Sequence, residues 1–242
     1  MLTIQKPLQP EWNPPAPEWL EEGVVVSINK PYGWTSADVV RKVKFALQRR
    51  WKIKNIKVGH AGTLDPLATG ILLVCIGKAT KSAESLQAQE KTYIASIRLG
   101  ATTPSFDLEK EIDQLYPCAH ITEEAVREAL SQMTGPLEQM PPQFSAKMVD
   151  GKRAYERARS GTETPLKPAS VEIYQTTLLS CQIPDLTVSI RCGKGFYVRA
   201  FARDLGYALQ SGAHLTDLVR SQNGPYHLEN ALDLETFEKI FI

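Results

Sequence analysis

The segment of the chain best suited to chemistry is the run from residue 59 to residue 70, Gly-His-Ala-Gly-Thr-Leu-Asp-Pro-Leu-Ala-Thr-Gly. Its ionisable side chains are one carboxylate, Asp65, and one imidazole, His60. The glycines predict a shaped loop whose backbone can approach a ligand closely, and Pro66 biases Asp65 away from helical geometry. A carboxylate presented in this way suits a nucleophile or an electrostatic stabiliser. Taken alone, however, the residues favour an Asp65 that merely closes a turn.

Other catalytic arrangements find little support. A glycosidase-type pair of acids would need a second carboxylate, and none lies near Asp65 in the sequence. Gly77-Lys78 and Gly193-Lys194 lack the spacing of a phosphate-binding P-loop. The cysteines form no Cys-x-x-Cys pair and the histidines are scattered, so we expect no metal site and reduced, mostly buried thiols. These residues are Cys75, Cys118, Cys181, Cys192, His60, His120, His214 and His227.

The charged residues are unevenly distributed along the chain. The formal net charge of +1, taken alone, argues against a nucleic-acid-binding protein. Yet no acid lies between Asp38 and Asp65, and residues 191–203 form a second acid-free basic stretch. Such segregation can create a positive face that attracts phosphate backbones, but a solvated helix surface explains it equally well. The basic residues are Arg41, Lys42, Lys44, Arg49, Arg50, Lys52, Lys54 and Lys57, then Arg191, Lys194, Arg199 and Arg203.

The apolar pattern predicts a mixture of strands and helices. Strands are expected over residues 24–29, 71–76, 91–99, 171–179 and 186–192. Helices are expected after Thr35 or Ser36, after Thr122 and from residue 196 to about 210, with a basic helix over residues 152–159. Because no regular βαβ rhythm is present, we predict an α+β fold and not a doubly wound sheet.

Length and composition indicate an ordinary globular protein of 242 residues, 43% of them hydrophobic. The proline-rich residues 1–21 predict an extended arm, and residues 22–242 a single domain. The longest apolar run, residues 71–76, is too short to cross a bilayer, and the N-terminus has no signal-peptide pattern. We therefore expect a cytoplasmic protein that does not contact membranes.

A resemblance to a known family rests on six segments in a fixed order. They are Asn29–Ser36, the loop at residues 59–70, Lys91–Tyr93, Pro141–Ala146, the basic segment Lys152–Gly161, and Cys192–Arg199 with its Lys-Gly-x-Tyr-x-Arg pattern. Together they resemble the bacterial tRNA pseudouridine-55 synthase family, of the TruB type, from about residue 24 to residue 225. A single Lys-Pro-x-Gly would be weak evidence, but the ordered set is specific.

The resemblance implies a pseudouridine synthase fold: a central mixed, mostly antiparallel sheet flanked by helices and loops, with an RNA-binding cleft. It implies an isomerase that converts uridine 55 of the tRNA T loop to pseudouridine, with the T arm of tRNA as partner. This reaction needs no redox change and no group donor, so we expect no cofactor and no metal. Many bacterial members of the family carry an additional C-terminal RNA-binding domain. Because only 18 residues follow Gly224, we expect no such domain here, and we expect a monomer.

The resemblance also assigns roles to single residues. Asp65 is the catalytic carboxylate, and Arg199 is expected to pair with it and keep it ionised. Because the target base must leave its stack to react, Tyr93 and Tyr197 are expected to stack on it. Tyr93 would otherwise be assigned to a strand core. The remaining expected substrate contacts are His60, Lys30 and Lys194, although His60 could instead order the loop and Lys30 could brace the site. The residues expected to shape the loop are Gly59, Gly62, Thr63 and Pro66. Phe196 departs from the family pattern, which has a small polar residue at this position.

Two other functions remain as alternatives. A non-catalytic RNA-binding or tRNA-folding protein could use the same scaffold, although it would not need the set Asp65, Tyr93 and Arg199. An aspartate-dependent hydrolase unrelated to RNA fits the two basic stretches poorly. Binding to tRNA at low salt separates the hydrolase from the other two functions.

Overall fold

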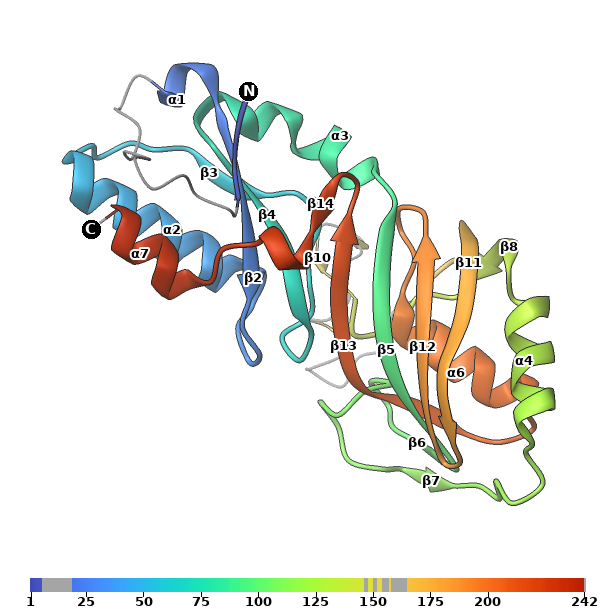
Figure 1. The fold of residues 1–242 in the computed structure, drawn as a ribbon. Coiled ribbons are helices and arrows are strands. Elements are labelled where there is room, and N and C mark those ends of the chain that lie inside the picture. Colours follow the sequence, from blue (N-terminus) through green and yellow to red (C-terminus); the bar gives the residue numbers. More distant parts are fainter. Residues whose placement is uncertain (6–18, 146–147, 150–151, 154–156, 158–164, 242) are drawn as a thin grey trace. The chain divides into compact units, whose positions relative to one another are not determined.

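The computed structural model describes residues 1–5, 19–145, 148–149, 152–153, 157 and 165–241. The chain forms two compact units, one made of residues 1–91 and 219–242 and the other of residues 92–218. Figure 1 shows the elements of both.

The first unit is built on a mixed sheet. Its strands run in the order β1 (Leu2–Ile4), β2 (Val24–Lys30), β4 (Thr69–Ile76) and the final part of β13 (Ala213–Asn223). The pairs β1–β2 and β4–β13 are parallel, whereas β2–β4 is antiparallel. Two short strands complete the sheet, since β3 (Val58–His60) pairs with β4 and β14 (Tyr226–His227) with β13.

Helix α2 (Ser36–Trp51) begins at a capping box and packs on the sheet by one face. The Thr35 side chain accepts the backbone N–H of Asp38, and the Asp38 carboxylate accepts that of Thr35. Its predicted apolar residues are buried with α7 (Leu234–Phe241), which lies beside it in Figure 1. The buried residues of α2 are Ser36, Val39, Val43, Ala46 and Leu47. The unit also contains α1 (Trp19–Glu22), α3 (Ala83–Ala88) and the 3₁₀ helices η1 (Gly77–Ser82) and η2 (Leu228–Asn230).

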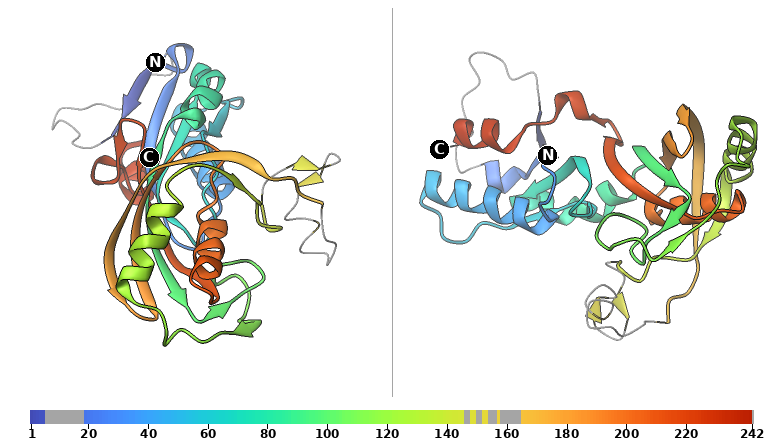
Figure 2. Two further views of the ribbon diagram at one scale, coloured as in Figure 1. Left: turned by 90° about the vertical axis from the view of Figure 1, so that its right-hand side faces the viewer. Right: turned by 90° about the horizontal axis from the view of Figure 1, so that it is seen from below.

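The second unit contains the first part of β13. The strands that follow it in the sheet are β5 (Lys91–Leu99), β12 (Asp185–Cys192), β11 (Ala169–Gln182) and β8 (Gly135–Gln139), in that order. Burial alternates along β5 and β12, as expected when one face of a strand covers a core. Helix α4 (Glu123–Gln132) lies against β11 and α6 (Val198–Ala208). Two small pairs are β6 (Ala101–Thr102) with β7 (Gln114–Leu115), and β9 (Met148–Val149) with β10 (Lys152–Arg153). The second pair stands apart from the sheet in Figure 2.

The predicted α+β class and its main strands and helices are confirmed. Three expectations are wrong in part. Residues 2–4 pair with β2 and residues 19–21 belong to α1, so these parts of the predicted arm are folded elements, while residues 6–18 lie outside the described residues. The ends of the predicted loop, residues 59–60 and 69–70, belong to β3 and β4. Residues 152–153 form a strand, and most of the predicted basic helix lies outside the described residues.

All four cysteines are free thiols, and Cys75 and Cys192 are buried as predicted. Burial raises the pKa of the Cys75 thiol to about 11, which makes it an unreactive core residue. Within the described part of the chain, no helix has the length and apolar character that crossing a membrane requires.

Two glycines with left-handed backbone differ in their surroundings and allow a matched test. Gly70 has φ +103°, and an added Cβ would lie 2.3 Å from the carbonyl oxygen of Arg220 on the neighbouring strand. Gly33 has φ +79° and open space within 4 Å. We expect Gly33→Ala to lower the free energy of unfolding by about 1–2 kcal/mol through backbone strain alone, and Gly70→Ala by at least about 3 kcal/mol. Urea unfolding measures both losses, and equal losses would contradict the close approach of β4 and β13.

Candidate active site

Asp65 lies in the loop that joins β3 to β4 in the first unit, residues 61–68, called here the Asp65 loop. The side chain of Asp65 is half-buried, and its carbonyl accepts the N–H of Ala68 at 3.1 Å, which closes a turn. The turn predicted from the residues alone is therefore present. It does not exclude a catalytic role, because it uses the backbone of Asp65.

Polar groups of β2, the following turn and α2 hold the middle of the Asp65 loop. The Ser36 hydroxyl donates to the Leu64 carbonyl at 3.1 Å and accepts the Leu64 N–H at 2.9 Å. The carbonyl of Pro66 accepts the N–H of Gly33 at 2.9 Å and the ammonium of Lys30 at 3.2 Å. Both residues next to Asp65 in the chain are thus fixed by hydrogen bonds.

Lys30 is a fully buried cation at the end of β2. Besides Pro66, its Nζ donates to the carbonyls of Trp34 at 2.7 Å and Pro31 at 3.0 Å. Burial lowers the pKa of Lys30 to about 8; the negative charge of Asp65 opposes this shift and the positive charge of Arg220 adds to it. Of the two roles expected for Lys30, contact with the substrate and bracing of the site, its burial and its three carbonyl acceptors favour bracing of the turn and the loop.

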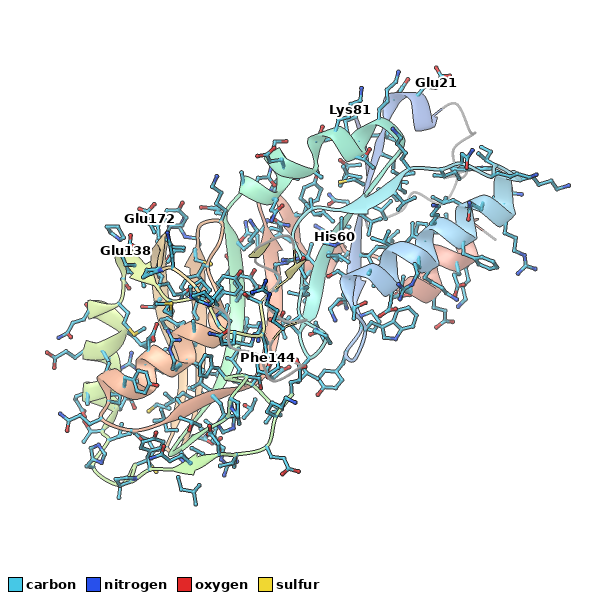
Figure 3. All side chains as sticks on the ribbon, turned by 180° about the vertical axis from the view of Figure 1, so that it is seen from behind. Glu21, His60, Lys81, Glu138, Phe144 and Glu172 are labelled. Carbon is cyan, nitrogen blue, oxygen red and sulfur yellow. The ribbon has the colours of Figure 1, made fainter. Side chains whose placement is uncertain are left out.

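Arg220 of β13 approaches the same loop and was not singled out by its sequence. It is 1% exposed and donates to the carbonyls of Ile71 at 2.7 Å, Gly62 at 3.2 Å and Thr63 at 3.4 Å. The two remaining first-unit residues with expected substrate or loop roles are His60, half-buried on β3, and Gly59 beside it. Figure 3 labels His60 on its strand.

In the second unit, Arg199 occupies the first turn of α6 and is 4% exposed. It donates to the carbonyls of Phe144 at 2.8 Å and Ser105 at 3.3 Å, and its Nε lies 3.7 Å from a carboxylate oxygen of Asp107. Arg199 is therefore not a surface arginine. Asp107, which the sequence analysis did not single out, is 7% exposed and forms this ion pair inside the unit.

The two tyrosines with expected stacking roles also belong to the second unit. Tyr93 is 7% exposed on β5, on the same buried face as Ala95 and Ile97. Tyr197 precedes α6, and the Gln139 side chain accepts its N–H at 2.8 Å and donates to its carbonyl at 3.1 Å. Gln139, 1% exposed, is a further positioning group that its sequence did not reveal.

The predicted site residues thus fall into two sets, one in each unit. Asp65, His60 and Lys30 form the first with the glycines, Thr63 and Pro66 of the loop. Tyr93, Tyr197 and Arg199 form the second, together with Lys194, which is exposed in the turn before α6. Among the residues that the structure describes, no three His, Cys, Asp or Glu side chains gather in a way that could hold a metal ion.

Comparison with known proteins decides the family. The profile of the TruB family pseudouridylate synthases (N-terminal domain) matches residues 49–198, more than half of the chain. A protein named tRNA pseudouridine synthase B from Bacteroides thetaiotaomicron is 55% identical over 223 residues, which cover 90% of this chain and 93% of that protein. The chain belongs to the TruB family. A protein of the same name from Flavobacterium johnsoniae is 44% identical and covers 92% of this TruB-family chain and 98% of its own length.

A solved structure agrees with this assignment. The crystal structure of a Cbf5–Nop10–Gar1 complex contains a chain with a TM-score of 0.68 and 25% identity, covering 94% of this TruB-family protein. The match spans 58% of that longer chain. The predicted pseudouridine synthase fold is therefore confirmed.

The buried ammonium of Lys30 gives this TruB-family protein a defined pH dependence of stability. Between about pH 8 and the ordinary pKa of 10.5, the unfolded chain holds more protons at this lysine than the folded chain does. The free energy of unfolding contributed by Lys30 therefore rises with pH across that window and is flat below it. We expect Lys30→Met to lack this rise.

Urea unfolding of both proteins from pH 7 to 10 measures the difference. Lys78→Met, on the surface 3₁₀ helix η1, serves as the matched control and should keep the rise of the native protein. Parallel curves for native protein and Lys30→Met would contradict the lowered pKa.

Proposed function

We propose that this TruB-family chain converts the T-loop uridine at position 55 of tRNA to pseudouridine, with Asp65 as its catalytic carboxylate. Relatives 44–55% identical over about nine-tenths of the chain are named tRNA pseudouridine synthase B. The observation that carries the choice of residue is the loop itself. Both neighbours of Asp65 are bonded to buried or helical groups, so its carboxylate is presented from a fixed backbone.

The reaction constrains what the protein must supply. The N1–C1′ bond of uridine breaks, the base turns, and C5 bonds to C1′; C5 then loses a proton and N1 gains one. Atoms and electrons balance without a co-reactant, so we propose no cofactor. Asp65 acts either on C6 of the base or on C1′ of the ribose, and either role requires an ionised carboxylate close to the flipped nucleotide.

We propose that the second set of residues receives the flipped base. Aromatic faces such as those of Tyr93 and Tyr197 stabilise an unstacked base by about 1–3 kcal/mol each. The guanidinium of Arg199 supplies a positive charge that favours the ionised form of a nearby carboxylate. Its ion pair with Asp107 and its hydrogen bonds to two carbonyls hold it in place.

We propose that the tRNA backbone is bound by the cations at the end of α2 and in the turn that follows. Arg49, Arg50, Lys52, Lys54 and Lys57 are all exposed and follow one another with no acid among them. Recognition by phosphate contacts and by the folded shape of the T arm suits a structured RNA. His60 and Lys194 are further proposed RNA contacts. We expect the protein to be a monomer in the cytoplasm. Sedimentation of the purified protein measures its oligomeric state.

The catalytic assignment predicts that Asp65→Asn abolishes pseudouridine formation at the T-loop uridine of an unmodified tRNA transcript. Because the amide cannot act as a nucleophile, we expect the rate to fall by at least about 10³-fold, with tRNA affinity retained. Asp185→Asn, an exposed aspartate of β12, is the matched control and should convert at the native rate.

Two outcomes would change the proposal. Activity in Asp65→Asn would transfer the catalytic role to another residue. No conversion by the native protein, with salt-dependent tRNA binding intact, would favour the RNA-binding or tRNA-folding function.

The surface assignment predicts a change in the salt dependence of tRNA binding. Arg49→Gln with Arg50→Gln should lower the slope of log affinity against log salt by roughly 1.4–1.8, because two phosphate contacts are lost. The control removes two cations that have carboxylate partners, by Arg127→Gln with Lys239→Gln. Equal slopes for the two double variants would place the tRNA elsewhere.

A further inference from the structure

Arg220 is a cation whose burial needs an explanation. It lies on β13, where Arg220 pairs with Gly70 and Val219 with Thr69 of the parallel strand β4. Only 1% of it is exposed. Removing a guanidinium from water is costly unless each of its donors meets an acceptor.

The acceptors of Arg220 lie at the two ends of the Asp65 loop. Nη2 and Nη1 donate to the carbonyls of Gly62 and Thr63, which come just before Asp65. Nε donates to the carbonyl of Ile71, which lies on β4 beyond the loop. One planar group therefore joins the segment that enters the loop to the segment that leaves it.

We infer that Arg220 is a positioning residue for the proposed reaction: its guanidinium ties the two ends of the Asp65 loop together and so holds the Asp65 carboxylate in its reacting position. This inference rests on the proposed function. It concerns a residue that has no role in the motifs that identified the loop. Arg220 acts through the loop backbone and, being buried, does not touch the substrate.

The geometry of arginine matters for this role. Its fork carries five N–H donors in fixed directions, which match carbonyls on separate segments. Lysine would keep the charge but concentrates its donors on one atom, and methionine would keep much of the volume without donors. Residues 61–68 form neither a helix nor a strand, so the Asp65 loop depends on groups outside it for its rigidity. A displacement of about 1 Å in a reacting group can cost on the order of 100-fold in rate.

A purely structural role makes a different prediction. Replacing a whole buried ion pair by apolar residues is often neutral, but removing only one partner of a buried polar contact is destabilising, so a loss of stability in an Arg220 variant does not by itself indicate a positioning role. If Arg220 is needed only for stability, its substitution should lower the conversion rate no more than a core substitution that lowers the free energy of unfolding by the same amount. A positioning residue should lower the rate of the chemical step in molecules that are fully folded and still bind tRNA.

The test compares Arg220→Lys and Arg220→Met with Phe237→Leu and Phe237→Ala. Phe237 is fully buried in α7, and its two substitutions bracket the loss of stability expected for a core site. Each variant is assayed well below its own melting temperature, with folding checked by circular dichroism. The readouts are tRNA affinity and the single-turnover rate of T-loop uridine conversion at saturating enzyme.

We expect both Arg220 variants to convert uridine on the order of 100-fold more slowly than native protein, with tRNA affinity within about threefold. The Phe237 variants should convert at the native rate. A second readout is electrostatic. Because the Arg220 charge contributes to lowering the pKa of Lys30, Arg220→Met should shift the Lys30-dependent rise in stability to higher pH, whereas the Phe237 variants should not.

Several outcomes would overturn the inference. They are native-like conversion by folded Arg220→Met, an equal rate loss in a Phe237 variant of matched stability, or failure of both Arg220 variants to fold, which would make Arg220 a folding residue. The proposed function has its own separate outcome. If native protein does not convert uridine, that proposal fails, whereas native conversion together with active Arg220 variants rejects only the positioning role.

Discussion

The backbone carbonyls of the Asp65 loop need hydrogen-bond donors from other elements, and the arrangement of the first unit depends on this constraint. An irregular segment beside a buried strand cannot satisfy its own carbonyls as a helix or sheet does, and unsatisfied buried carbonyls are costly. Ser36, Lys30 and Arg220 supply the missing donors from α2, β2 and β13. Each of these elements must therefore be in place before Asp65 has a defined position.

Two of these three donors, Lys30 and Arg220, are cations, and their charges interact with each other and with Asp65. Lys30 and Arg220 are both buried, and Arg220 disfavours the charge on Lys30 whereas Asp65 favours it. A carboxylate in this loop thus offsets part of the cost of burying the ammonium of Lys30. The same arrangement would be less stable with a neutral side chain at residue 65.

Short sequence patterns predicted the structural features that depend on neighbouring residues. The buried faces of α2, β4 and β5 followed from periodicity, and the Asp65 loop from its glycines and proline. Side chains whose partners lie far away in the sequence were not predicted, because nothing near them in the sequence marks those partners. Arg220 resembles an exposed charge in a polar stretch, yet its acceptors lie about 150 residues earlier. Asp107 likewise belongs to an acidic segment, residues 107–113, in which nothing marks its ion pair with Arg199.

The cations of the chain fall into an exposed group and a buried group with different roles, which the net charge does not show. The exposed cations after α2 are screened by salt and can act only on ligands that approach the surface, which suits affinity for a phosphate backbone. Lys30, Arg199 and Arg220 are buried, so salt barely reaches them, and they act on backbone carbonyls whose positions define the loops. Binding and geometry are thereby assigned to different residues. A protein organised in this way can vary its surface to suit its RNA without disturbing the position of Asp65.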